Sequence, residues 1–293
     1  MDFRLSSRRL RWVTLVAAAT IMTSLTPGIF TSGGAIAQNL PSLDQWQSAG
    51  FKPNVDTTPN RSDVGGTRGP ENAPMEGLSL MALVPKYNQF GVTIAGNPQI
   101  LVYLPTAKTD RIVRLELEEV TPGRLGSGPT RKFVYAQEWE VGQNGGIMNL
   151  SLPPSIPHNN HPQAQRSLMQ TNQDYRWVVL VYDNTDAITG QVEGYIRQID
   201  PGQVNWQNVE PTAGPIPNYL ASLTPHRKGT VLFQNFVWYD AIAALAQAYQ
   251  DDPMATAADW QQVLELAGFS PAEIATVLTQ MAQSRQFIEG ELL

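Results

Sequence analysis

The segment Ile112-Val113-Arg114-Leu115-Glu116-Leu117-Glu118 alternates between apolar and charged residues with a period of two. This alternation is typical of a β-strand that has one face against a hydrophobic core and the other face in water. A second segment, Tyr175-Arg176-Trp177-Val178-Val179-Leu180-Val181-Tyr182, is apolar almost throughout. Such a run is typical of a central strand with both faces covered. Together the two segments predict a β-sheet core in the middle of the chain.

Six further segments between residues 78 and 200 have the length and composition of strands. They are Leu78–Val84, Phe90–Ala95, Gln99–Leu104, Lys132–Glu140, Ile147–Leu152 and Gln191–Ile199. Turn-forming residues separate them, for example Gly96-Asn97-Pro98 and Asn144-Gly145-Gly146. About eight short strands with no helical period between them predict an antiparallel β-sandwich, immunoglobulin-like or related, over residues 78–200.

From Thr224 onward the hydrophobic period becomes that of an α-helix, and residues 224–293 are predicted to form a small helical domain. Thr224-Pro225 is an N-cap followed by a proline at the first helical position, and it opens the first helix. Ser270-Pro271-Ala272-Glu273 is a capping box that opens the last helix. Two more helices are expected between them, over about Trp238–Gln250 and Asp259–Ala267.

Residues 1–37 have the three parts of a secretory signal peptide. The basic part holds four arginines, the apolar part runs from Trp12 to Met22, and Ala35-Ile36-Ala37 is a small-x-small cleavage site. We therefore expect cleavage after Ala37 and export to the periplasm or the extracellular space, with no membrane span after cleavage. The alternative, in which the segment is retained as a membrane anchor, stays open.

Two segments rich in proline connect these parts. Residues 38–77 hold five prolines and are predicted to be a Pro/Gly-rich linker, in which Leu43, Trp46 and Phe51 could make one short helical turn but little more. Residues 201–223 are predicted to be a second connector, between the strands and the helices. We expect this second connector to be packed in part, because it contains Trp206.

The composition excludes several classes of function. The chain has 293 residues, no cysteine and a net charge of −6, which becomes −9 without residues 1–37 and their four Arg and one Asp. The lack of cysteine excludes disulfides, thiolate zinc sites and iron–sulfur clusters. The acidic balance argues against nucleic acid as a partner, since nucleic-acid binding needs clustered Lys and Arg.

No motif in the sequence indicates a cofactor. His158 and His161 have an H-x-x-H spacing, but the prolines beside them predict a solvated loop rather than a metal site.

Six short segments occur along the chain in a recognisable order. They are Leu80-Met81-Ala82-Leu83-Val84-Pro85, Leu104-Pro105, Leu150-Ser151-Leu152-Pro153, Tyr175-Arg176-Trp177, Val192-Glu193-Gly194-Tyr195-Ile196 and Trp238-Tyr239-Asp240-Ala241. In this order they resemble the exported cyanobacterial family known as domain of unknown function 928. The resemblance covers about residues 66–267 and implies an exported protein of shared architecture, but it implies no activity.

A second resemblance is local. The segment from Trp238 to Pro253 is similar to the second helix of a tetratricopeptide-type helical hairpin, with Ala241 and Ala248 where two helices approach closely. Only one such unit is visible in the sequence, whereas about three are usually needed for a stable array. We therefore predict one TPR-like hairpin that docks on the sandwich.

Five residues in these segments are candidates for a functional or structural cluster: Glu193, Arg176, Trp238, Tyr239 and Asp240. Glu193 is interpreted as an ion-pair partner of Arg176 or Arg197 on a neighbouring strand, with a role in a site as the alternative. Trp238 and Tyr239 are interpreted as anchors of the helical hairpin. Asp240 is interpreted as a partner of a helix end or of an arginine, and no catalytic residue is assigned.

Two hypotheses for the function stay open. In the first, the chain is an exported envelope protein without enzymatic activity, which binds or scaffolds another envelope protein or a polysaccharide. In the second, it is a carboxylate-dependent hydrolase of carbohydrate that uses a pair such as Glu193 and Asp183, because glycoside hydrolysis needs two opposed carboxylates. A cleft that holds two carboxylates would favour the second hypothesis. The sequence indicates neither a ligand nor an oligomeric state.

Overall fold

The computed structural model describes residues 40–48, 79–123, 128–158, 161–209, 214–284, 287–288 and 290–293. The predicted signal peptide and most of the predicted linker lie outside these residues. Ala37–Leu293 cluster into one compact unit, so the strands and the helices are described together.

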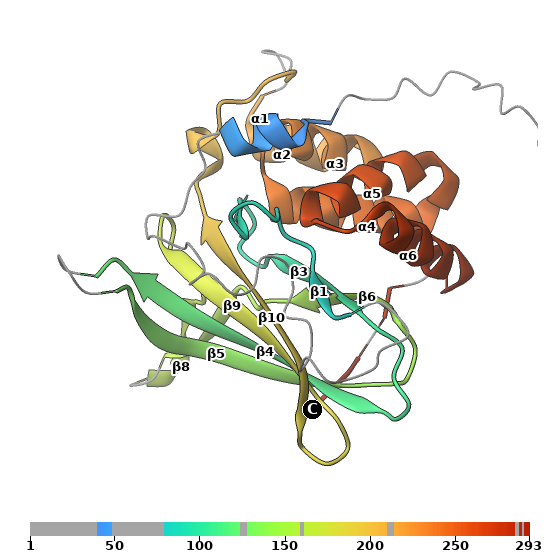
Figure 1. Cartoon of the computed structure of the whole chain (residues 1–293). Helices are drawn as coiled ribbons and strands as arrows, with labels where there is room; N and C mark the ends of the chain where they lie inside the picture. Colours follow the sequence, from blue (N-terminus) through green and yellow to red (C-terminus); the bar gives the residue numbers. More distant parts are fainter. Residues whose placement is uncertain are drawn as a thin grey trace, which may run out of the picture. The chain divides into compact units, whose positions relative to one another are not determined.

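The main sheet contains the two segments from which the fold was predicted. It has six strands in the order β11-β5-β4-β9-β10-β2. Their bounds are β2 (Phe90–Thr93), β4 (Arg111–Thr121), β5 (Thr130–Val141), β9 (Asp174–Tyr182), β10 (Ile188–Gln198) and β11 (Glu291–Leu292). The long strands curl across the lower part of Figure 1, so that the sheet resembles half of a barrel. Neighbouring strands are antiparallel except for β2 and β10, which are parallel.

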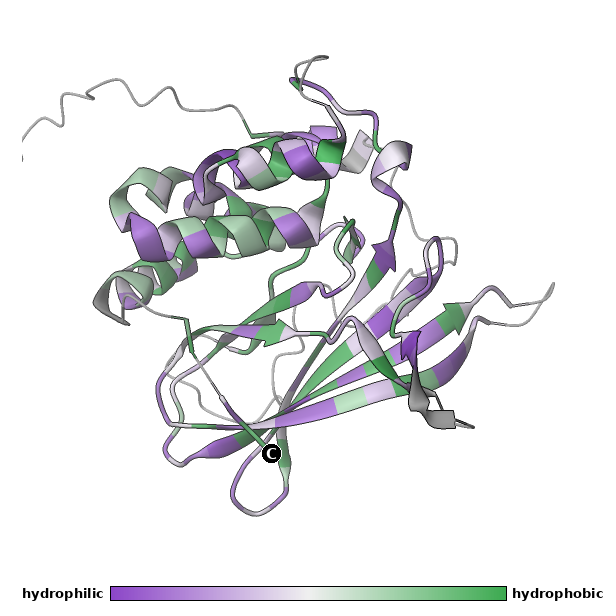
Figure 2. Ribbon diagram, turned by 180° about the vertical axis from the view of Figure 1, so that it is seen from behind, coloured by the Kyte–Doolittle hydropathy of each residue, from purple (hydrophilic) through white to green (hydrophobic). Residues whose placement is uncertain are grey.

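A smaller antiparallel sheet has the order β1-β3-β6. Its strands are β1 (Met81–Ala82), β3 (Gln99–Leu104) and β6 (Gly146–Ser151). In both ribbon views this sheet lies between the helices and the long strands of the main sheet (Figures 1 and 2). A separate hairpin joins β7 (Ser155–His158) to β8 (His161–Ser167). The prediction of a loop around His158 and His161 is therefore wrong, since both residues belong to paired strands.

Each of the eight predicted segments contains a strand, and seven of them shift only slightly at their ends. The first, Leu78–Val84, shortens to Met81–Ala82, and Leu78 lies outside the described residues. Along β4 the burial alternates as the sequence predicts, and Val113, Leu115 and Leu117 are fully buried. The prediction of a β-rich, mostly antiparallel architecture followed by helices is confirmed, whereas an immunoglobulin-like sandwich is not confirmed. The parallel pair of β2 and β10 joins strands that are about a hundred residues apart, and local periodicity contains no information about such pairing.

Five helices follow the strands: α2 (Ile216–Ser222), α3 (Pro225–Gln234), α4 (Trp238–Asp251), α5 (Pro253–Ala267) and α6 (Pro271–Ser284). The predicted caps are confirmed: Thr224 accepts the N–H of Arg227, and Ser270 and Glu273 form a reciprocal capping box. The region is a run of helices rather than a single hairpin. α5 begins earlier than predicted because the Asp252 side chain caps it, and α2 lies within the predicted connector.

Part of the predicted linker packs against these helices. α1 (Leu43–Ser48) places Trp46 against Phe233, Phe236 and Trp238, with ring centroids between 5.0 and 5.2 Å apart. Only 3% of the Trp46 surface is exposed. Leu40 and Trp46 are thus part of the hydrophobic core, and this piece of the predicted linker is packed against the helices.

None of the helices in the described part of the chain is long and apolar enough to cross a membrane. Hydrophobic and hydrophilic residues alternate along the strands in Figure 2.

Candidate functional site

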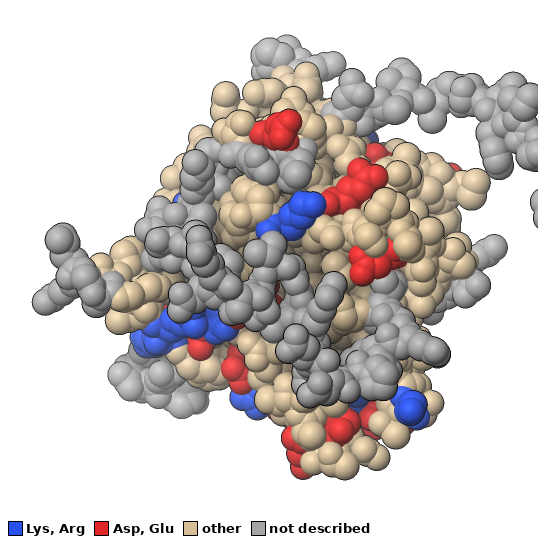
Figure 3. Space-filling view, in the orientation of Figure 1, with Lys and Arg blue, Asp and Glu red and all other residues tan. Residues whose placement is uncertain are grey.

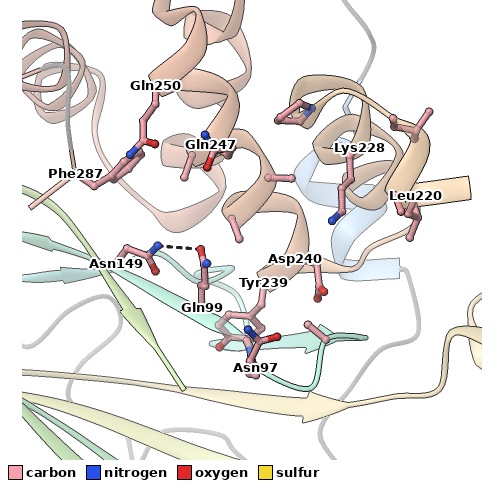
Figure 4. Close-up of a pocket in the computed structure, with 18 of the residues that line it drawn as sticks. Asn97, Gln99, Asn149, Leu220, Lys228, Tyr239, Asp240, Gln247, Gln250 and Phe287 are labelled. Atoms are coloured by element: carbon pink, nitrogen blue, oxygen red, sulfur yellow. Dashed lines mark hydrogen bonds between the residues drawn. The ribbon is translucent and has the colours of Figure 1, made fainter. Parts of the chain in front are cut away.

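A pocket of about 660 Å³ lies along one side of α4. Asp240, Ala243, Gln247 and Gln250 line it and stand three or four residues apart, which places them on one face of the helix. The opposite wall comes from the turn before β3, from β3 and from β6. Figure 4 shows Lys228 pointing in from α3, and Gln99 and Asn149 on the strands across from α4. Small alanine side chains on α4 leave the space open.

Amide side chains dominate the polar lining. They are Asn97, Gln99, Asn149, Gln247 and Gln250. The Asn149 side-chain amide donates to Gln99 Oε1 at 2.9 Å, while Asn149 Oδ1 is buried with no hydrogen-bond partner in the described part of the chain. Asn97, Gln247 and Gln250 are exposed. An amide carries both a donor and an acceptor, so this lining is suited to hydroxyl groups, which also do both.

Asp240 lies at the α2/α3 end of the pocket. Its carboxylate accepts the backbone N–H of Ile94 at 3.1 Å and a hydrogen bond from the Thr93 hydroxyl. Burial raises the pKa of Asp240 above its ordinary value, and these two hydrogen bonds and the positive charge of Lys228 only partly oppose that effect. Among the described residues that line the pocket, Asp240 is the only carboxylate.

Aromatic side chains line the other end. Trp139 of β5 and Phe287 contribute to the wall, together with Ile288 and Gly290 of the C-terminal segment. Phe287 is held in place by Tyr249 and Trp260, with ring centroids at 6.4 and 5.9 Å. The pocket therefore has a polar, charged end and an aromatic end, joined by a row of amides.

Trp238 and Tyr239 anchor α4 to the strands, as predicted. Trp238 Nε1 donates to the Leu83 carbonyl at 2.9 Å. The Tyr239 hydroxyl accepts from Trp177 Nε1 at 2.7 Å and donates to the Tyr195 carbonyl at 3.0 Å. Both aromatic residues are fully buried, although the edge of Tyr239 reaches the pocket wall.

α4 packs closely against β2 because the strand has a glycine, Gly91, where it meets Trp238 and Tyr239. A Cβ at Gly91 would lie 2.9 Å from both Trp238 Cβ and Tyr239 Cε2. Contacts of that length do not occur without a shift of the backbone, so only glycine fits at this position.

Arg176 and Glu193 lie on the main sheet, and neither is among the described residues that line the pocket. The predicted ion pair between them is confirmed, and Arg176 also pairs with Glu118 at 2.8 Å. Asp183 lies in the exposed turn after β9, and its carboxylate accepts hydrogen bonds from Thr185 and Ala187 of the same turn. Glu193 is opposite Val178, five residues from Asp183, or roughly 17 Å along the strand. The structure therefore does not bring Glu193 and Asp183 together.

The model of a family described as Domain of Unknown Function (DUF928) matches residues 63–278, which is most of the chain. The chain belongs to this family. No curated protein matches the DUF928 chain.

Solved structures match the DUF928 chain only weakly. One is a chain of the CsuC–CsuE chaperone–tip adhesion subunit pre-assembly complex of Acinetobacter baumannii, with a TM-score of 0.27 and 12% identity over 43% of this chain and 52% of that chain. Another is a β-glucosidase of Listeria innocua in complex with gluconolactone, with a TM-score of 0.22 and 10% identity over 43% of this chain and 16% of that chain. The matches thus span about half and about a sixth of those chains, and TM-scores this low do not establish a shared fold.

Of the five candidates, only Tyr239 and Asp240 are among the pocket-lining residues of the DUF928 chain. Sequence reasoning missed Lys228 and the amides. One signal was present on α4, where Asp240, Gln247 and Gln250 stand at helical spacing beside a row of alanines. No comparable signal marks Asn97, Gln99 or Asn149, because tertiary packing alone brings them to α4. No group of three or more metal-binding side chains is found among the described residues.

Proposed function

We propose that this DUF928 chain is an exported binding protein that holds a segment of a neutral polysaccharide in the pocket beside α4. The observation that carries the proposal is the row of amides between Asp240 and the aromatic end of the pocket. Sugar hydroxyls both donate and accept hydrogen bonds, and the apolar face of a sugar ring packs on aromatic side chains. The pocket volume of about 660 Å³ falls within the range of about 300–1,000 Å³ that is typical for small-molecule sites.

The charges favour a neutral ligand. Lys228 and Asp240 contribute opposite charges to the same end of the pocket. The whole chain is acidic, and on the face shown in Figure 3 acidic and basic side chains are scattered among uncharged ones. A polyanion would meet an unfavourable overall field here, whereas a neutral sugar chain would not.

The same lining supports binding rather than hydrolysis. Glycoside hydrolysis needs a second carboxylate about 5–10 Å from the first, as nucleophile or as base. Asp240 has no such partner among the described lining residues, and Glu193 is held by Arg176. The Tyr239 hydroxyl is already engaged on both sides, which leaves no free phenol to replace the carboxylate.

The proposed localisation outside the cytoplasm follows from the N-terminal segment. Residues 1–37 have the features of a cleavable signal, and a polysaccharide partner would be met in the envelope. We therefore include export, with cleavage after Ala37, in the proposal.

Saturation-transfer NMR with a panel of neutral hexasaccharides (cellohexaose, maltohexaose and chitohexaose) tests the binding function. We expect at least one of them to bind the parent protein. We expect Ala243→Phe to abolish this binding, because the new ring fills the pocket. Gln247→Ala should weaken it by about threefold to tenfold, because one neutral hydrogen bond is lost.

Ala107→Phe is the matched control, since residue 107 lies in a different pocket and the variant should bind the hexasaccharide as the parent does. Circular dichroism of Ala243→Phe, Gln247→Ala and Ala107→Phe checks that each variant folds as the parent does. The proposal is wrong if none of the three hexasaccharides binds at millimolar concentration, or if Ala243→Phe binds as well as Ala107→Phe. Release of reducing ends during the experiment would favour the hydrolase instead.

A further inference from the structure

A second pocket, of about 340 Å³, lies at the opposite end of β9 and β10 from Arg176, next to the turn between β3 and β4. The described residues that line it include none of those that line the first pocket. Aliphatic groups make most of its wall, from Leu80, Pro105, Ala107 and Val181. Hydroxyl groups of Ser79, Thr106, Thr109 and Thr189 are interspersed among them.

Arg111 forms part of this wall and is 5% exposed. Its Nη1 donates to the Pro105 carbonyl and its Nη2 donates to the Asn144 carbonyl at 2.7 Å. Its Nε is buried and has no hydrogen-bond partner in the described part of the chain. The guanidinium is thus fixed in place by two neutral carbonyl groups, and its Nε–H donor is left unused.

Arg111 also has no counter-ion among the described residues. Arg114, Arg176 and Arg197 each pair with a carboxylate, whereas none of the ion pairs found among the described residues includes Arg111. Burial lowers the pKa of Arg111, as expected for a cation that is removed from water without an anion beside it. A buried charge without a partner is unfavourable, and a bound anion would offset that cost.

The other charges at the pocket allow an anion to bind. Lys108 is exposed and adds a second positive charge to the lining. Asp183 also lies on the wall, but its carboxylate is held within its own turn by hydrogen bonds from Thr185 and Ala187. Asp183 forms none of the ion pairs found among the described residues, and the charges of Arg111 and Lys108 together outnumber its own.

We propose that this pocket binds a small organic carboxylate, whose anionic group pairs with the Arg111 guanidinium and whose short apolar body packs on Leu80, Pro105 and Val181. Arginine presents its N–H groups as a planar fork, which matches the two oxygens of a carboxylate. The volume is at the lower end of the range of about 300–1,000 Å³ for small-molecule pockets, which fits a ligand of few atoms. This site is independent of the polysaccharide pocket.

Titration calorimetry with hexanoate and with its neutral analogue hexanamide tests the proposal on the mature protein. The two probes share the apolar body and differ in charge. We expect hexanoate to bind at least about tenfold more tightly, since a hydrogen bond to a charged group is worth more than a neutral one. Equal affinities for the two probes, or no binding of hexanoate at millimolar concentration, would overturn the proposal.

Three variants locate the site. Ala107→Phe fills the pocket and should abolish hexanoate binding, and Arg111→Gln should do the same. Lys108→Ala removes an exposed charge and should weaken binding by about twofold to fivefold. Ala243→Phe, in the other pocket, should leave the hexanoate affinity unchanged.

If Arg111→Gln fails to fold, Ala107→Phe decides the outcome, because residue 107 is partly exposed and its side chain makes no hydrogen bond. Hexanoate affinity equal to the parent's in Ala107→Phe would overturn the proposal. A loss of hexanoate binding in Ala243→Phe would move the site to the other pocket and overturn it as well.

Discussion

Trp177 occupies the space that any side chain at position 194 would need. A Cβ at Gly194 would lie 2.5 Å from Trp177 Cζ2, and the indole is held by its hydrogen bond to Tyr239. We expect Gly194→Ala to lower the free energy of unfolding by about 1–3 kcal/mol, because the ring must move within a packed core. Gly142→Ala is the matched control, since a Cβ there meets nothing within 4 Å. Equal urea midpoints for the two variants would contradict this account of Trp177.

Asp240 makes the stability depend on pH in a defined direction. Its pKa is raised in the folded protein from an ordinary value of 3.8, because burial disfavours the carboxylate. A raised acid pKa means that folding favours the protonated form. The folded state therefore loses stability as the pH rises from the unfolded-state pKa to the raised folded-state pKa, and this loss is complete above the latter.

Asp240→Asn removes this titration. We expect the free energy of unfolding of the variant, relative to that of the parent, to rise across the same pH window and then to stay constant. Urea denaturation of both proteins at a series of pH values measures the difference. A difference that does not change with pH, or that falls as the pH rises, would contradict the raised pKa of Asp240.

At the scale of elements, two tryptophans hold α1 and α4 in different ways. Trp46 of α1 packs on aromatic rings, and its Nε1 is buried without a hydrogen-bond partner in the described part of the chain. Trp238 of α4 makes a similar aromatic contact, but its Nε1 also donates to the Leu83 carbonyl. The two residues are buried to a similar degree, so they form a matched pair.

Replacement of each tryptophan by phenylalanine separates packing from hydrogen bonding. Trp46→Phe should lower the free energy of unfolding only by the effect of the smaller ring, because Trp46 Nε1 makes no hydrogen bond in the described part of the chain that could be lost. Trp238→Phe should cost about 1–3 kcal/mol more, because it leaves the Leu83 carbonyl unsatisfied in the core. Thermal or urea unfolding of the two variants gives the comparison, and a larger loss for Trp46→Phe would contradict it.

The sequence predicts most elements because their signals are local. The alternation in β4, the cap at Thr224 and the capping box at Ser270 each involve only a few neighbouring residues, and all three are confirmed. The short helical turn of α1 was expected, but its packing was not, because the contacts of Trp46 are with Phe233 and Trp238, nearly two hundred residues away. The short pair of β7 and β8 was missed because prolines hide its strand pattern.

For the whole molecule, the candidate site was the hardest part to predict. The ion pair of Arg176 with Glu193 and the anchoring by Trp238 were predicted from neighbouring strands and from helix packing, and both are confirmed. The pocket itself combines α4 with the turn before β3, with residues of β3 and β6, and with the C-terminal segment. No periodicity within one segment reveals a surface made from so many separate segments.

The processing of the chain gives one prediction for the molecule as a whole. The proposed cleavage after Ala37 leaves Gln38 at the N-terminus and raises the negative charge by three units, because residues 1–37 hold four Arg and one Asp. Intact-mass spectrometry of the protein isolated from its native cells measures this directly. A mass that includes residues 1–37 would contradict cleavage and would favour the retained anchor.

The parallel pairing of β2 with β10 has a consequence for the timing of folding. β2 leaves the ribosome about a hundred residues before β10, and its register, Phe90 opposite Tyr195, requires the later strand. Pairings of such long sequence separation close late and slow the folding of the chain. The main sheet can therefore be completed only after synthesis has passed β10. The same pairing that closes the main sheet therefore also delays its completion, which is compatible with the proposed export of an unfolded chain.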